Sequence, residues 1–114
     1  MELTSSEDAF LSALVVAKES WLRYAVEAVA NPSSAKWSDA HAAWVSLSEC
    51  AQREDDRAAF RAIVNHLLSG LVHSMLVTLD GGSVLSETTT LTIQDAEGVT
   101  LKSFLHEYWP DYSD

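Results

Sequence analysis

The sequence predicts a mainly α-helical protein, with a bundle-like core of three helices, a C-terminal β-hairpin and a short terminal turn of helix. Apolar residues recur at helical intervals in three long stretches, and polar or proline-containing segments separate those stretches. Near the C-terminus the pattern changes to strict alternation, which is typical of a strand. The length of 114 residues fits a single domain that spans the whole chain and can bury a core of its own.

The first helix is predicted over residues 5–30. A serine followed by Glu7 and Asp8 offers a capping oxygen and negative charge at the N-terminus, where the helix dipole is positive. Asn31 precedes a proline and therefore avoids the helical conformation, which ends the helix. Its apolar residues define one broad face: Phe10, Leu11, Leu14, Val15, Trp21, Leu22, Ala25, Val26 and Val29.

Two further helices are predicted over residues 38–53 and 55–80. Ser38 can cap the earlier one, in which Cys50 is expected to be a small core residue. The later one has the most regular apolar pattern, so we expect it to form the centre of the core, with Leu71 buried. Its apolar residues include Ile63, Val64, Leu67, Leu68, Leu71, Val72, Met75, Leu76 and Leu79.

A two-stranded hairpin is predicted over residues 88–102. Apolar and polar residues, many of them β-branched, alternate between Thr89 and Gln94, and the alternation resumes at Val99. Between these runs, residues 95–98 read as a turn that ends in glycine. Because an isolated hairpin is marginal in water, we expect its apolar side to pack on the helices, before a last helical turn near the C-terminus.

The charge balance restricts the kinds of partner. Seventeen acidic and seven basic residues give a net charge of −10, which opposes binding to nucleic acid or to an anionic membrane. The chain begins with acidic residues, where a secretory signal needs basic ones, and no apolar run is expected to span a membrane. We therefore expect a cytoplasmic protein, without a cofactor, whose partner is a basic protein.

Histidines provide the alternative of a metal-dependent helical-bundle enzyme. His66 and His73 share one side of the third predicted helix, and His41 or His106 would have to complete the site. Seven helical residues span about 10 Å, which is a poor spacing for two ligands of one ion. No nucleophile motif or phosphate-binding glycine loop is present in the sequence, so enzymatic activity is not favoured.

The C-terminal segment mixes aromatic and acidic residues in a way that suits a binding surface. Its predicted contact residues are Glu107, Tyr108, Trp109, Asp111 and Tyr112. These features predict a non-enzymatic acidic binding protein. In the competing interpretation the aromatic side chains seal the core, with Trp109 inward and Tyr112 outward. A self-associating scaffold that uses Trp37 and the small-residue side of the third helix is a further alternative.

Three features together resemble small uncharacterised bacterial proteins: the stretch from Leu71 to Gly82, a polar-apolar hairpin, and the closing Leu105-His106-Glu107. Some proteins of this build resemble immunity proteins, which neutralise toxins in competition between bacteria. The similarity covers about the last 45 residues and assigns no functional residue. It implies that the basic partner is a toxin and that the protein is its inhibitor.

Overall fold

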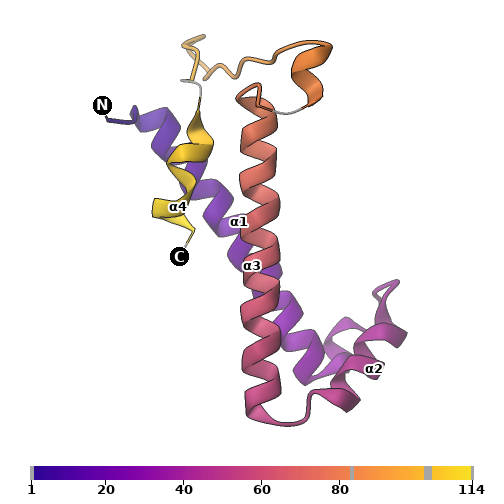
Figure 1. Cartoon of the computed structure of the whole chain (residues 1–114). Helices are drawn as coiled ribbons and strands as arrows, with labels where there is room; N and C mark the ends of the chain where they lie inside the picture. The colour runs from indigo at the N-terminus through magenta and orange to yellow at the C-terminus, as the bar shows by residue number, and fades with distance from the viewer. Residues whose placement is uncertain (1, 83, 102–103, 114) are drawn as a thin grey trace. The chain divides into compact units, whose positions relative to one another are not determined.

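The computed structural model describes residues 2–82, 84–101 and 104–113 (Figure 1). Within these ranges the chain is mainly helical, as the sequence predicts. Its α-helices are α1 (Ser5–Ala30), α2 (His41–Cys50), α3 (Glu54–Leu79) and α4 (Trp109–Tyr112). Three short 3-10 helices accompany them: η1 (Pro32–Ala35), η2 (Val84–Glu87) and η3 (Leu105–Glu107).

The limits of α1 match the prediction, because both ends are set by local chemistry. At the N-terminus Thr4 and Glu7 form a reciprocal cap. The Glu7 N–H donates to Thr4 Oγ1 at 3.2 Å, and the Thr4 N–H donates to Glu7 Oε1 at 2.8 Å. The capping residue is therefore a threonine rather than one of the predicted serines. At the other end Asn31 leaves the helix, and Pro32 begins η1.

Helix α2 is shorter than predicted at both ends. The Ser38 hydroxyl accepts the N–H of Ala40 at 3.0 Å, which makes a turn there instead of a helix start. Cys50 is the last residue of α2 and is exposed, so the prediction of a core cysteine is wrong. After Ala51, whose carbonyl accepts the Arg57 Nε–H at 3.0 Å, the chain turns into α3.

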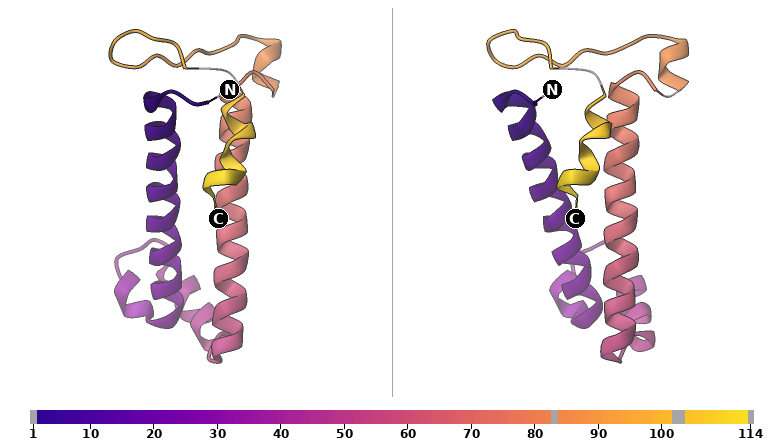
Figure 2. Two further views of the ribbon diagram at one scale, coloured as in Figure 1. Left: turned by 90° about the vertical axis from the view of Figure 1, so that its left-hand side faces the viewer. Right: turned by 60° about the vertical axis from the view of Figure 1, so that its left-hand side comes forward.

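The chain divides into two units, which we call the terminal unit (Met1–Ala17 and Ser69–Asp114) and the central unit (Lys18–Leu68). Helices α1 and α3 each pass from one unit into the other. The terminal unit has a core in which α4 lies against the first half of α1 and the last turns of α3 (Figure 2). Its buried apolar residues are Leu11, Leu76, Leu105 and Trp109. The buried apolar residues of the central unit are Leu22, Ala25, Ala28, Val29, Ala35 and Ala51.

Helix α3 is less buried than the sequence predicts. Leu76 is its one fully buried residue in the described chain, and Leu71 is 60% exposed, so the expectation of a buried Leu71 is wrong. The reason is that α3 packs within the terminal unit through the side that holds Val72 and Leu76, whereas its apolar residues extend further around the helix. By length and composition only, α3 is apolar enough to cross a membrane, a test that core helices of soluble proteins also pass.

The predicted hairpin over residues 88–102 is wrong, because the described residues of this segment contain no β-strand. One antiparallel bridge joins Gln94 and Thr100. The predicted turn does form: Gly98 has φ +83°, a conformation in which glycine carries no side-chain penalty, and its N–H donates to the Asp95 carbonyl at 3.0 Å.

The path of the chain after the turn explains why the bridge between Gln94 and Thr100 does not extend into a pair of strands. Phe104 adopts a left-handed conformation with φ +67°, and η3 begins at the next residue. Leu105 is 1% exposed and belongs to the core of the terminal unit. From Phe104 onward the described chain is therefore helical rather than extended, and the threonines at 88–90 are exposed.

Candidate partner-binding surface

The C-terminal segment, Leu105–Ser113, is fixed to the terminal unit by polar contacts on three of its residues. The first contact links its start to the end of α3. Asp80 Oδ2 accepts the backbone N–H of His106 at 3.0 Å and lies 2.7 Å from Nδ1 of the same imidazole. The Asp80 side chain is 5% exposed and that of His106 is 22% exposed. This carboxylate therefore holds both the backbone and the ring of His106.

Trp109 provides the second contact and is 1% exposed. Its indole Nε1–H donates to the Ser69 carbonyl at 3.0 Å and lies 3.1 Å from Ser69 Oγ. A buried indole with its N–H paired is a core residue that offers no surface to a partner. The position of Trp109 agrees with the interpretation in which the aromatic residues seal the core.

Tyr112 provides the third contact and is partly buried rather than fully outward. Its hydroxyl donates a hydrogen bond to Asp8 Oδ1 on α1. This hydrogen bond raises the pKa of the Tyr112 hydroxyl above its ordinary value, and burial and the charges of Asp8 and Asp111 act in the same direction. Tyr108 is partly buried as well. Among the predicted contact residues, only Glu107 and Asp111 are exposed.

Three exposed carboxylates lie on or beside this segment, and we call them the acidic edge: Asp8, Glu107 and Asp111. They come from α1, η3 and α4, respectively. Tyr112, which follows Asp111 in α4, donates its hydroxyl hydrogen bond to Asp8, so α4 lies beside Asp8 of α1. The described residues of the terminal unit include no lysine or arginine, so no cation of that unit neutralises the acidic edge there.

The net charge is distributed very unequally between the two units. The terminal unit contains ten acidic residues and one basic residue, which gives −9. The central unit contains seven acidic and six basic residues, which gives −1. Nearly all of the charge of −10 therefore belongs to the unit that carries the acidic edge.

A turn in the same unit adds further negative charge. Asp95 accepts the N–H groups of Val99 and Glu97 at 2.9 and 3.0 Å, and the Ser6 hydroxyl at 3.1 Å. The hydrogen bond from Val99 is the main cause that lowers the pKa of Asp95. Asp95 is therefore held in its charged form.

The histidine candidates for a metal site are only partly brought together. The rings of His73 and His106 meet edge to face with their centroids 5.6 Å apart. His66 belongs to the central unit. Among the described residues, no group of three His, Cys, Asp or Glu side chains could hold a metal ion. The metal-enzyme alternative is thus supported only by the contact between the His73 and His106 rings, and the described residues provide no set of three ligands.

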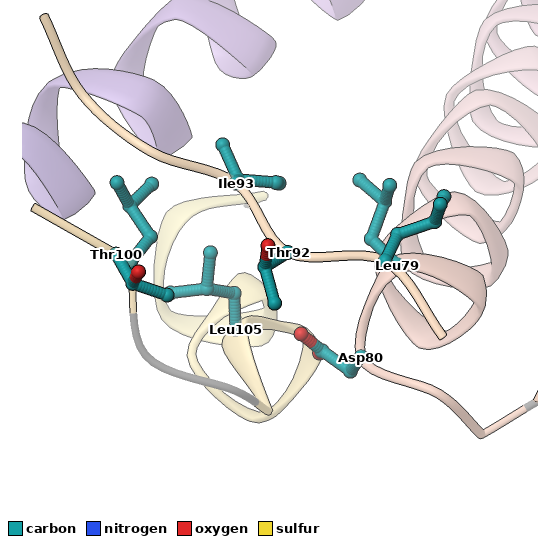
Figure 3. A pocket seen from close by; sticks show the side chains of 8 residues that line it. Leu79, Asp80, Thr92, Ile93, Thr100 and Leu105 are labelled. Carbon is teal, nitrogen blue, oxygen red and sulfur yellow. The ribbon is translucent and has the colours of Figure 1, made fainter. Parts of the chain in front are cut away.

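A small cavity lies beside Asp80, between the end of α3 and the extended segment (Figure 3). Its volume is about 40 Å³, and Leu79, Ile93 and Leu105 are among its lining residues. A cavity of this size holds a water molecule but no substrate, because ligand pockets measure about 300–1,000 Å³. This cavity beside Asp80 is therefore too small to admit a substrate.

Sequence reasoning missed an aromatic hollow in the central unit. Trp21, Tyr24 and Trp44 line it, with a volume of about 560 Å³. Neighbouring rings stand edge to face, with centroids 5.8 Å apart for Trp21 and Tyr24 and 6.1 Å apart for Tyr24 and Trp44. Trp21 is 64% exposed. The spacing of Trp21 and Tyr24, three residues apart on one helix, is a signal that could have identified it.

Comparison of the chain with protein-family models, with curated proteins and with solved structures gave no match.

Proposed function

We propose that this chain is a non-enzymatic binding protein whose acidic edge, formed by Asp8, Glu107 and Asp111, takes a basic protein as its partner. The observation that carries this proposal is the charge of −9 on the terminal unit, compared with −1 on the central unit. Concentrated charge of one sign raises the association rate with an oppositely charged surface and selects against other partners.

The contacts that hold the C-terminal segment in place favour binding by a rigid surface. Trp109 is anchored in the core, His106 is held by Asp80, and Tyr112 is bonded to α1. Residues already fixed by such contacts lose little conformational freedom when a partner binds. In this proposal the aromatic residues therefore support the carboxylates, and the carboxylates make the contact.

The kind of partner follows from charge and from the resemblance to immunity proteins. An acidic protein inhibits a basic toxin by covering the positive surface with which that toxin contacts its target. We propose a toxin of the nuclease type, because an enzyme that grips nucleic acid needs such a surface. Inhibition by coverage requires no catalytic group on this chain.

Calorimetric titration with an arginine-rich peptide tests the acidic edge directly. The double variant Glu107→Gln with Asp111→Asn should bind the peptide more weakly and with a smaller salt dependence. The matched control is Glu27→Gln with Glu49→Gln, which removes the same charge from exposed positions of the central unit. It should leave both quantities nearly unchanged.

Equal weakening in the two double variants would refute the acidic edge, because net charge alone would then account for binding. The inhibitor assignment has a separate test. Expression of the chain together with a toxin encoded beside it should restore growth, and the acidic-edge variant should restore it less well. If that variant restores growth as well as the native chain, the acidic edge is not part of the inhibitory contact.

A further inference from the structure

The aromatic hollow of the central unit has walls from two helices and from the connection between them. Trp21 and Tyr24 come from α1, and Trp44 comes from α2. The remaining described residues that line it are Ser20, Ser38 and Ala40. All of them belong to the central unit. At about 560 Å³ the hollow has the size of a ligand site, since such sites measure about 300–1,000 Å³.

Contacts between neighbouring rings hold these walls in place. Tyr24 meets both Trp21 and Trp44 edge to face, with interplanar angles of 73° and 76°. Trp44 meets Phe60, another residue of the central unit, in the same way, with centroids 6.1 Å apart. Such pairs are favourable because the positive edge of one ring faces the negative face of the other. Side chains that are already held by contacts lose little freedom when a ligand binds.

Walls at these steep angles suit a compact ligand better than a flat one. A flat ring system binds best between parallel ring faces, and neighbouring rings of the hollow are far from parallel. A rounded cation such as trimethylammonium contacts several rings at once and is attracted within about 6 Å of each centroid. The centroids here are 5.8 and 6.1 Å apart, so one cation comes within reach of more than one ring.

The charges beside the hollow favour a cation. Asp39 is exposed and lies between two of the lining residues, Ser38 and Ala40, in a turn that the Ser38 hydroxyl fixes by accepting the Ala40 N–H. The nearby ammonium of Lys36 is held 5.5 Å from the centroid of the Trp37 ring and does not line the hollow. A cation there would meet ring faces and a carboxylate, whereas an anion would meet no basic lining residue.

We propose that the aromatic hollow binds a quaternary ammonium group, with Trp21, Tyr24 and Trp44 as walls and Asp39 at the rim. An ordinary ammonium has N–H donors that need acceptors, and the mainly aromatic lining offers few of them. A quaternary ammonium has no such donor, and its methyl groups gain from apolar contact. Choline and the side chain of a trimethylated lysine both carry this group. The site does not involve the acidic edge and is independent of the proposed partner binding.

Choline and its neutral isostere, in which carbon replaces nitrogen, test the role of charge on the native full chain. In a titration followed by the NMR signals of the indole N–H groups, millimolar choline should shift Trp21 and Trp44. The isostere should bind at least about fivefold more weakly. Trp37 is an internal control, because it is 89% exposed and does not line the hollow. Potassium chloride at matched concentrations corrects for ionic strength.

Variants of the walls and the rim test the residues themselves. Trp21→Leu removes one ring from a side chain that is 64% exposed, so the helical circular dichroism should remain. Its affinity for choline should fall at least about fivefold, and Trp21→Phe should restore part of it. Trp37→Leu is the matched control and should leave the affinity unchanged. Asp39→Asn should weaken the binding of choline about two- to fivefold, and should not weaken that of the isostere.

Equal binding of choline and its isostere would overturn the proposal, because the hollow would then be merely apolar. Choline binding that survives Trp21→Leu would overturn it too, and if that variant does not fold, the comparison on the native chain decides. A trimethyllysine peptide distinguishes the source of the group. If it binds at least about tenfold more tightly than choline and than its unmethylated form, the source is a protein side chain; equal affinity for choline indicates a free small molecule. No shift of Trp21 and Trp44 with either probe would refute the site.

Discussion

Replacing Trp109 by alanine is the most direct test of how the terminal unit is held together. Burial of a tryptophan removes about 150–250 Å² from water, and at about 25 cal/mol per Å² this contributes roughly 4–6 kcal/mol. Truncation series give about 3–5 kcal/mol for the loss of a large aromatic residue. The variant also loses the indole hydrogen bond to Ser69. We expect the free energy of unfolding to fall by about 3–5 kcal/mol.

Urea unfolding followed by circular dichroism, at one fixed protein concentration, measures this change. A loss of that size is a large share of the total stability of about 5–15 kcal/mol for a protein of this kind. Trp37→Ala is the matched control, because Trp37 is 89% exposed. It should change the free energy of unfolding by less than about 0.5 kcal/mol.

A change below about 1 kcal/mol in Trp109→Ala would refute the placement of this residue in the core. Its indole would then be available to a partner, as in the first interpretation of the sequence. If the alanine variant does not fold, Trp109→Phe retains most of the apolar surface and loses the N–H. That variant should cost about 1–3 kcal/mol, because the acceptors on Ser69 lose their donor.

Three further predictions concern the same unit. Leu76→Ala should cost about 2–5 kcal/mol in urea unfolding, because Leu76 is 1% exposed. Asp80→Asn should cost about 1.5–3 kcal/mol in the same assay, since a charged acceptor of the His106 N–H is lost. The hydrogen bond to Asp8 raises the folded-state pKa of Tyr112 above its unfolded value, so its stabilisation is complete below pH 10.0 and is lost as pH rises through the folded-state pKa. Tyr112→Phe should therefore destabilise the protein at neutral pH and make less difference above that value.

Each of these predictions has a control or a contradicting result. Leu91 is 47% exposed, so Leu91→Ala should cost less than Leu76→Ala, and equal costs would contradict the described core. An Asp80→Asn variant as stable as the native chain would show that this carboxylate does not hold the C-terminal segment. For Tyr112, absorbance titration should show one tyrosine that ionises later than the others, and Tyr112→Phe should remove that late step.

Local chemistry made several elements predictable from the sequence. The proline after Asn31 ends α1 at the expected residue, because its ring excludes the helical conformation just before it. The acidic residues at Glu54 begin α3, where the positive end of the helix dipole stabilises them. Gly98 forms its turn since no side chain opposes a positive φ. Each of these effects depends on residues within one helical turn.

The hairpin prediction failed because strand formation depends on distant partners. The alternation between Thr89 and Gln94 is real, but a strand also needs a neighbour along its length and an apolar surface on which to pack. In this chain Phe104 diverts the return segment, and Leu105 joins the core of the terminal unit. The turn residues 95–98 were therefore read correctly, but the alternation on either side did not produce a strand in the described part of the chain.

The candidate site was predictable in composition but not in arrangement. The sequence by itself determined the excess of acidic residues, the helices and the aromatic C-terminus, because these depend on residue type and local spacing. Only the tertiary structure decided that Trp109 is buried, that Leu71 is exposed, and that nearly all of the charge belongs to one unit. The physical reason is that burial depends on which segments pack together. Apolar residues with the same helical spacing can therefore lie in a core or on the exposed surface.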